Sequence, residues 1–282
     1  MRPLLTIFAF LFAVSTLFAQ QKVHYTAEDQ AVFDKYVAYI KPYEAKPMET
    51  VLEKTAGFFL GTPYVAHTLE VTPSEELVVN LRELDCTTFV ENVIALSLAA
   101  KSGDLSFCRF TDELRNIRYR NGEINGYQSR LHYASDWVFE NEKRGLVKNI
   151  SRSLGGIKET RKIDFMSAHP EAYRQLKSDT EMREKIVAME NSLNSRDGFY
   201  YLPKNKIAAQ AKNIPHMAMI AFVTSIKGLD ATHVAFAYRK KNGELSFIHA
   251  SSLAGKVVID KKSLSNYCAS QKNNTGVMIC DL

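Results

Sequence analysis

The sequence changes its hydrophobic periodicity near residue 199, and this change restricts the fold more than any other feature. Before it, apolar residues recur at helical spacing, and in segment 86–100 they cover almost the whole circumference of a helix, as expected of a buried helix. After it, short apolar segments are separated by turn residues, as in consecutive strands. We predict strands at 199–202, 217–224, 232–238, 244–251, 256–259 and 276–280. Helices followed by consecutive strands predict an α+β domain with a mainly antiparallel sheet.

The part of the chain before the strands contains several further helical patterns. The first, 26–42, begins with Thr26 and Asp29, which can cap a helix N-terminus. Other helical patterns lie at 47–59, 112–119, 133–141 and 182–193 and just after Pro170, and 77–82 is predicted to be a short strand or an extended entry into the next element. The sequence has no internal repeat and no linker, so we predict one domain over residues 20–282 with additional helical segments.

Residues 1–19 have the pattern of a secretory signal peptide, with Arg2, an apolar run over 4–18, and Ala19 before two glutamines. The run is shorter than the ~20 residues that a membrane-spanning helix needs, and no cysteine follows it to carry a lipid. We therefore expect cleavage after Ala19, a periplasmic or secreted location, and no stable membrane insertion once the signal is removed.

Composition and charge restrict the classes of function. With 46% hydrophobic and 24% charged residues, the chain is globular rather than disordered. Its net charge of +5 is mild and the basic residues are dispersed, which gives no support to nucleic-acid binding. The four cysteines, at 86, 108, 268 and 280, lack metal-ligand spacing, so no metal site is predicted. A disulfide among Cys108, Cys268 and Cys280, with Cys268–Cys280 as the preferred pair, stays open for an oxidising compartment.

The junction 84–91 places Cys86 at the start of the predicted buried helix. The positive end of the helix dipole stabilises a thiolate there, which is what a nucleophile requires. Two caps are compatible with the sequence: Asp85 caps with Cys86 in the first turn, or Thr88 and Glu91 form a capping box with Cys86 just outside. A buried structural cysteine is the alternative interpretation.

Two predicted strands far downstream each carry one histidine, His233 and His249, and form a hairpin. A nucleophilic cysteine needs a base within hydrogen-bond reach, and that base needs a third group to orient it. Cysteine, then histidine, then a polar residue is the chain order of papain-like enzymes. The two histidines are therefore candidates for these roles, the alternative being ordinary strand histidines.

The hairpin register decides whether the histidines can cooperate. With a two-residue loop, Phe236 pairs with His249 and the two imidazoles point to opposite faces. With a three-residue loop, 241–243, and Gly243 in the left-handed conformation, both imidazoles share one face as diagonal neighbours. The catalytic interpretation requires the second register.

Five segments of the chain, taken in order, resemble a family of secreted bacterial cysteine amidases that was long catalogued as a domain of unknown function. The family belongs to the papain-like, NlpC-type superfamily of cell-wall hydrolases. The resemblance covers nearly all of the mature chain and is carried by 61–64, 84–91, 129–133 with Asp136-Trp137, 232–236 and 249–252. It implies a papain-like fold and N-acetylmuramoyl-L-alanine amidase activity on muropeptides, with Cys86 as nucleophile, His233 as base and His249 as orienting residue.

Substrate contacts are expected within and near the matching segments. The stretch 118–137 mixes guanidinium groups with aromatic rings, which can hold stem-peptide carboxylates and pack on sugars. Arg130 and Tyr133 are the preferred binders there. Tyr64, Asp85 and Ser251, in the matching segments, complete the predicted set.

One position departs from the family pattern: such enzymes usually carry a Gly-Asp pair entering the strand that precedes the His233 strand, whereas this chain has Pro215-His216-Met217-Ala218. The local turn and a substrate contact there are therefore in doubt. Two alternatives stay open, a stem-peptide endopeptidase in which Asp85 holds a free amino terminus, and a non-catalytic muropeptide-binding protein. No cofactor is predicted, because thiol and imidazole supply the nucleophile and the proton transfer.

Overall fold

The computed structural model describes residues 22–282, so the predicted signal peptide lies outside the described residues. The helices are α1 (Ala27–Ile40), α2 (Met48–Phe58), α3 (Cys86–Ser102), α4 (Phe107–Arg118), α5 (Ala134–Lys143), α6 (Phe165–Ala168), α7 (Thr180–Asn194), α8 (Ile207–Gln210) and α9 (Leu264–Ser270). The strands are β1 (Val23–His24), β2 (Leu77–Val78), β3 (Lys148–Asn149), β4 (Ile157–Glu159), β5 (Phe199–Pro203), β6 (Met219–Thr224), β7 (Ala231–Arg239), β8 (Leu245–Ser251), β9 (Lys256–Ile259) and β10 (Asn274–Asp281).

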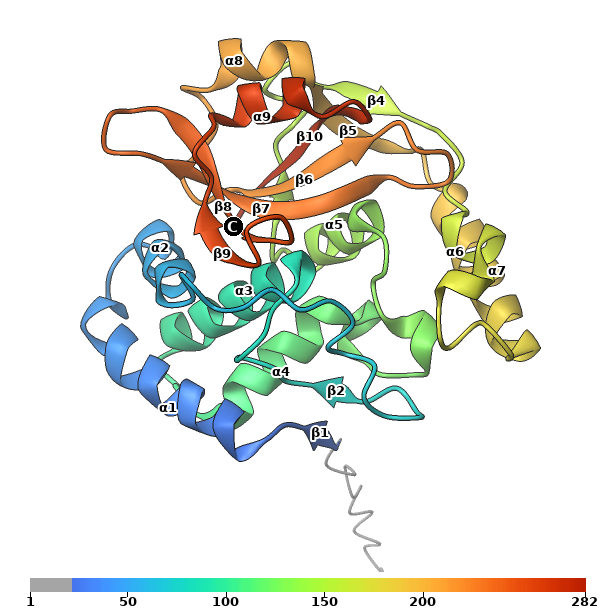
Figure 1. The fold of residues 1–282 in the computed structure, drawn as a ribbon, viewed down its shortest axis with the longest axis horizontal. Helices are drawn as coiled ribbons and strands as arrows, with labels where there is room; N and C mark the ends of the chain where they lie inside the picture. Colours follow the sequence, from blue (N-terminus) through green and yellow to red (C-terminus); the bar gives the residue numbers. More distant parts are fainter. Residues whose placement is uncertain (1–21) are drawn as a thin grey trace, which may run out of the picture.

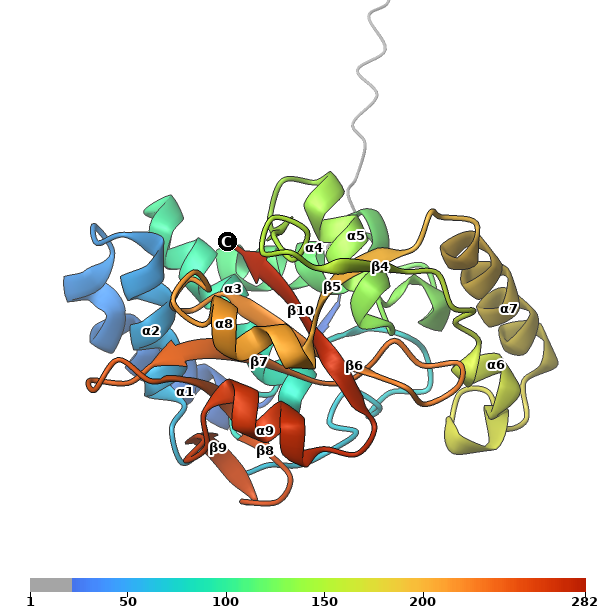
Figure 2. The same cartoon turned by 90° about the horizontal axis from the view of Figure 1, so that it is seen from above.

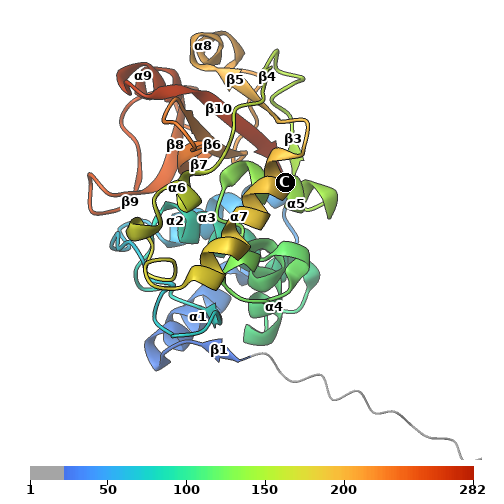
Figure 3. The same cartoon turned by 90° about the vertical axis from the view of Figure 1, so that its right-hand side faces the viewer.

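An antiparallel sheet forms the middle layer of the molecule, with strand order β4-β5-β10-β6-β7-β8-β9 and β3 paired to β10. Helices α1 to α4 cover one side, and α8 and α9 cover the other (Figures 1 and 3). Helices α6 and α7 lie at the opposite end of the molecule from α1 and α2 (Figure 2). The mixed fold with N-terminal helices and a mainly antiparallel sheet is confirmed.

Helix α3 is the central element of the core. Its residues from 88 to 100 are buried, apart from Leu98, because its apolar side chains surround the helix. The Phe89 ring meets the Phe236 ring of β7 edge-on at 6.0 Å. Asp85 is the N-cap, and it forms a capping box with Thr88, so Cys86 is the first helical residue. The first of the two predicted caps is therefore the correct one.

The β7–β8 hairpin has the register that the catalytic interpretation requires. Phe236 pairs with Ile248, not with His249. The Lys240 N–H donates to the Glu244 carbonyl, which leaves a three-residue loop, and Gly243 has a φ of 84°, which favours glycine. Side chains alternate across the sheet, so both histidines lie on one face.

Several predicted features differ in the structure. Segment 77–82, predicted as a short strand or an extended entry, contains the two-residue β2, and the helical patch after Pro170 is a single 3₁₀ turn. Helix α9 was not predicted. All four cysteines are free, because Cys268 packs between α9 and the sheet whereas Cys280 faces the core on the other side. Among residues 22–282, no helix is long and apolar enough to span a membrane.

Candidate active site

Cys86 lies where the start of α3 meets the sheet, and its side chain is half-buried. Burial raises the pKa of the Cys86 thiol to about 11, with a further contribution from the neighbouring Asp85 carboxylate. Hydrogen bonding with the Val234 backbone and with Thr87 acts in the opposite direction and is outweighed. Desolvation is the largest influence on this thiol, and it opposes the stabilisation of a thiolate that is predicted for the helix N-terminus.

The two histidines form a direct hydrogen-bonded pair. His233 Nε2 and His249 Nδ1 are 2.7 Å apart, and the rings meet edge-on with centroids separated by 4.9 Å. Burial lowers the pKa of His233 to about 3, with His249 contributing, and lowers that of His249 to about 4. Both rings are therefore neutral at pH 7, and one of the two facing nitrogens carries the shared proton.

Asp260 lies behind His249 and was missed by the sequence interpretation. Its Oδ2 is 3.6 Å from His249 Nε2, a nitrogen that is buried and has no hydrogen-bond partner. Asp260 Oδ1 accepts a hydrogen bond from the Lys262 backbone N–H, which fixes the carboxylate in the turn after β9. The one sequence signal for Asp260 is its position directly after β9. That strand pairs with β8, which carries His249.

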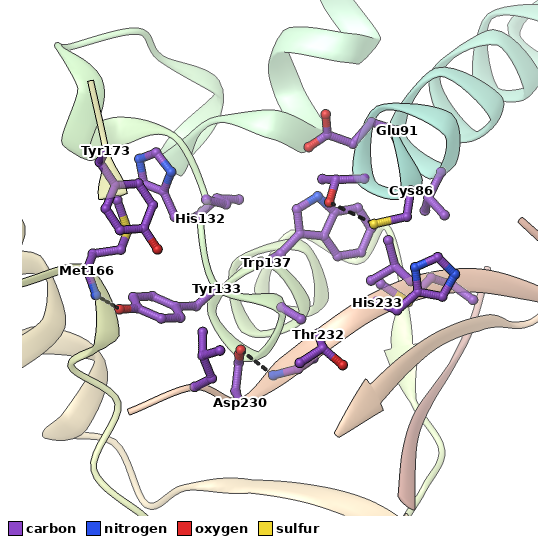
Figure 4. A pocket seen from close by; sticks show the side chains of 18 residues that line it. Cys86, Glu91, His132, Tyr133, Trp137, Met166, Tyr173, Asp230, Thr232 and His233 are labelled. Atoms are coloured by element: carbon purple, nitrogen blue, oxygen red, sulfur yellow. Dashed lines mark hydrogen bonds between the residues drawn. The ribbon is translucent and has the colours of Figure 1, made fainter. Parts of the chain in front are cut away.

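Cys86 and His233 line one pocket, at which the ends of α3 and β7 meet (Figure 4). No hydrogen bond joins them in the described part of the chain. The side-chain hydrogen-bond partner of the Cys86 sulfur is the Thr87 hydroxyl, at 4.0 Å. The expected direct hydrogen bond between Cys86 and His233 is thus not formed. His233 Nε2 is engaged with His249, so Nδ1 is the nitrogen left to receive a proton.

The pocket has a volume of about 200 Å³ and a mostly apolar wall. Its polar lining residues include Thr87, Glu91, His132, Asp230 and Thr232, and no lysine or arginine is among its lining residues. The lining residues are Cys86, Thr87, Val90, Glu91, Leu131, His132, Tyr133, Ala134, Trp137, Met166, Tyr173, Met219, Leu229, Asp230, Ala231, Thr232, His233 and Val234.

The predicted carboxylate binder Arg130 is corrected by the structure. Its guanidinium donates two hydrogen bonds to Glu75, both at 2.8 Å, and lies over the Tyr127 ring. Arg130 does not line the pocket. A guanidinium fork that is filled by an internal carboxylate is not available to a substrate carboxylate.

The other four predicted substrate contacts differ in where they lie and in which of their polar groups are already hydrogen-bonded. Tyr133 lines the pocket, but its hydroxyl donates to Glu190 and accepts from the Met166 N–H, so only its ring is available. Tyr64 lies near Cys86 and Asp85, whose charges contribute to its raised pKa after burial. The Asp85 carboxylate is used in the helix cap. The Ser251 hydroxyl accepts a hydrogen bond from the Ala254 N–H.

The turn before β6, where the sequence predicts a departure from the family pattern, is built without glycine. Met217 has a φ of 61°, in the left-handed region that favours glycine, and its N–H donates to the Ala237 carbonyl. His216 Nδ1 accepts from the Arg239 N–H and Nε2 lies 3.6 Å from Glu53. None of these residues lines the pocket. Residues 22–282 contain no cluster of three or more side chains suited to hold a metal.

Comparison with known proteins shows which family this chain belongs to. Residues 54–277 match the model of the N-acetylmuramoyl-L-alanine amidase-like family. An N-acetylmuramoyl-L-alanine amidase from Bacteroides uniformis is 36% identical, with a TM-score of 0.75 over 83% of this chain and 97% of that one. A Bacteroides fragilis protein with the provisional name of xylanase is 37% identical, with a TM-score of 0.76 over 81% and 99%.

A more distant Legionella pneumophila protein, 24% identical with a TM-score of 0.64 over 89% of this chain and 96% of that one, shares the fold. A search of curated proteins found no match. The family model covers most of the chain, and the similarity extends over nearly the full length of the similar structures. This protein therefore belongs to the N-acetylmuramoyl-L-alanine amidase-like family.

Proposed function

We propose that the protein is a papain-like, NlpC-type cysteine amidase that cleaves the amide between the lactyl group of N-acetylmuramic acid and L-Ala in muropeptides. The observation that carries this proposal is the His233–His249 pair at 2.7 Å, which leaves His233 Nδ1 free in the pocket that also contains Cys86. A nucleophile, a base and an orienting group are the set that covalent amide hydrolysis needs.

In the proposed first step, the Cys86 sulfur attacks the lactyl carbonyl carbon while His233 Nδ1 takes the thiol proton. The tetrahedral intermediate expels the L-Ala amine as His233 returns that proton to its nitrogen, which leaves a thioester on Cys86. Water, deprotonated by His233, then hydrolyses the thioester and restores the thiol. Because the resting thiol is protonated, His233 acts as a general base during the attack.

The intermediate carries a negative oxygen that needs donors. The backbone N–H of Cys86 is at the first position of α3, where helix N–H groups lack internal partners and the helix dipole is positive. Each such donor is worth about 3–4 kcal/mol of the barrier in other enzymes. His249 stabilises the imidazolium by its bond to Nε2.

Product analysis on a defined muropeptide tests the bond cleaved. We expect release of a peptide with a free L-Ala amino terminus, whereas a sugar that still carries L-Ala would identify a stem-peptide endopeptidase. Cys86→Ala is expected to abolish hydrolysis while muropeptide binding persists, and Cys108→Ala, which changes an exposed cysteine on α4, is the matched control with full activity. Binding without any turnover by the unmodified protein would establish the non-catalytic alternative.

The proposal includes a periplasmic or secreted location, with residues 1–19 removed as a signal peptide. Amino-terminal sequencing of the protein exported by its host is expected to begin at Gln20. A protein recovered with Met1 in place would contradict this part of the proposal.

A further inference from the structure

The pocket beside Cys86 carries no positive charge, and this restricts which part of a muropeptide can enter it. Its lining contains the buried carboxyl groups of Glu91 and Asp230, which are 2% and 1% exposed. His132 is neutral, because burial lowers its pKa to about 3. The adjoining Arg118 does not line the pocket, and it donates to Glu91 at 2.6 Å and to the Val78 carbonyl at 2.7 Å. A stem-peptide carboxylate would therefore enter without a positively charged partner, which is unfavourable.

Trp137 supplies an unused hydrogen-bond donor in the same pocket. Its side chain is buried, with the residue 4% exposed, and its indole Nε1–H is buried and has no partner. Figure 4 shows the nitrogen-bearing edge of the indole on the side of the pocket where Cys86 and Glu91 lie. Buried donors in native proteins are nearly always paired, so this group calls for an acceptor that the chain does not provide.

The wall around this donor is built from aliphatic and thioether side chains. Val90, Leu131, Met166, Met219 and Leu229 present methyl and methylene groups to the pocket. An apolar wall beside an unpaired neutral donor fits a small uncharged group that has a methyl and a carbonyl oxygen. The acetamido group of N-acetylmuramic acid has this composition, whereas the stem peptide brings carboxylates.

We propose that this pocket binds the N-acetylmuramoyl side of the substrate, with Trp137 Nε1–H donating to the acetamido carbonyl oxygen. The anionic stem peptide then lies on the other side of Cys86, outside the pocket. This inference rests on the proposed function, because it assumes that the bond next to the muramoyl group reaches Cys86.

The test compares two substrates and two enzymes. The substrates are N-acetylmuramoyl-L-Ala-D-isoglutamine and its analogue with hydrogen in place of the acetamido group, and the enzymes are wild type and Trp137→Phe. We expect wild type to lose roughly tenfold in kcat/KM on the analogue, which corresponds to about 1.4 kcal/mol. On the acetylated substrate, the kcat/KM of Trp137→Phe is expected to be roughly tenfold below that of wild type. On the analogue, the kcat/KM values of Trp137→Phe and wild type are expected to be nearly the same.

Equal kcat/KM of wild type on the two substrates would overturn the inference, and this arm does not depend on folding of the variant. If Trp137→Phe still prefers the acetylated substrate over the analogue by the full wild-type ratio of kcat/KM, the proposed role of the indole is wrong. If wild type releases no L-Ala-terminated peptide from either substrate, the proposed function itself fails. Cys86→Ala gives the baseline for all four measurements.

The contact between His249 and Asp260 carries a second inference. If His233 Nδ1 receives the thiol proton, His233 Nε2 must carry hydrogen and donate to His249 Nδ1. His249 then bears its own proton at Nε2, the buried nitrogen 3.6 Å from Asp260 Oδ2. We infer that Asp260 is a positioning residue that fixes this tautomer of His249.

Asp260→Asn tests this role, because its amide oxygen can keep the bond to the Lys262 N–H while the charge is lost. We expect kcat to fall about tenfold with KM nearly unchanged, and Asp260→Glu to recover part of the loss. Asp179→Asn, the same change at a helix cap on α7, is the matched control with unchanged kcat.

A double variant separates positioning from a structural role. If Asp260 acts through His249, adding Asp260→Asn to His249→Ala produces no further loss of kcat. An equal additional loss in the His249→Ala background would overturn the inference, as would an unchanged kcat for Asp260→Asn in the otherwise intact enzyme.

Discussion

The protonation state of Cys86 can be measured, and the structure predicts an uncharged resting pair. The pKa of the thiol is raised to about 11 and that of His233 is lowered to about 3. Forming thiolate and imidazolium from the neutral pair then costs about 11 kcal/mol at 1.36 kcal/mol for each unit of pKa difference. Even if the two charges approached to about 4 Å, their attraction would return only about 4 kcal/mol at an effective dielectric constant of 20. A net cost of about 7 kcal/mol leaves the ion pair in about one molecule in 10⁵.

Alkylation by iodoacetamide measures the thiolate directly, because the thiolate is the reactive form. We expect the rate at Cys86 to rise about tenfold with each pH unit from 6 to 9 and to show no plateau. The exposed Cys108 serves as an internal reference, and Cys86 is expected to react no faster than Cys108 at pH 7. Cys268 and Cys280 are fully buried and are not expected to interfere.

A Cys108→Ser variant isolates the Cys86 signal. A rate plateau at neutral pH that His233→Ala removes would show a resting thiolate–imidazolium pair and would refute the reasoning. The error would then lie in the assumption that desolvation outweighs the helix dipole and the imidazole charge at this position.

Three further predictions concern stability and chemistry. Arg118→Met is expected to lower the free energy of unfolding by about 3–5 kcal/mol, because it leaves the Glu91 carboxylate buried and unpaired; urea titration should show partial recovery when Glu91→Gln is added, and no recovery would contradict the pairing argument. His249→Ala is expected to retain more hydrolysis than Cys86→Ala in a muropeptide assay, since it removes orientation rather than the nucleophile; equal loss would assign His249 a larger role. Full activity is expected in excess chelator, and loss with chelator alone would exclude the cysteine mechanism.

The parts of the fold that follow from local chemistry could be predicted from the sequence. The apolar circumference of 86–100 specified a buried helix, and the glycine at 243 supplied the left-handed residue that a three-residue hairpin loop requires. The boundaries of α4 and the short helix α9 were not predicted, because polar or short segments owe their helicity to tertiary packing.

The site could be predicted only as far as residue type and order allow. Cysteine and histidine are chemically specific, so Cys86, His233 and His249 stood out before their separation was known. Arg130 was misassigned because nothing in its neighbourhood reveals Glu75, a partner 55 residues earlier that fills its guanidinium. The raised pKa of Cys86 was also beyond the sequence, since it depends on how far the sheet closes over the start of α3.

The three-residue loop of the β7–β8 hairpin can change in length without changing how the two strands pair. An inserted peptide at the tip lengthens the loop and leaves the pairing of Phe236 with Ile248 unchanged. Removal of one of residues 241–243 shortens the loop to two residues and also keeps this pairing, because Lys240 and Glu244 still close the hairpin. Removal of one residue between Phe236 and Lys240 instead moves His233 by one position along its strand and turns its imidazole to the face opposite that of His249. A change of length at residue 242 is therefore expected to be tolerated, whereas one codon lost from this part of β7 is expected to inactivate the site.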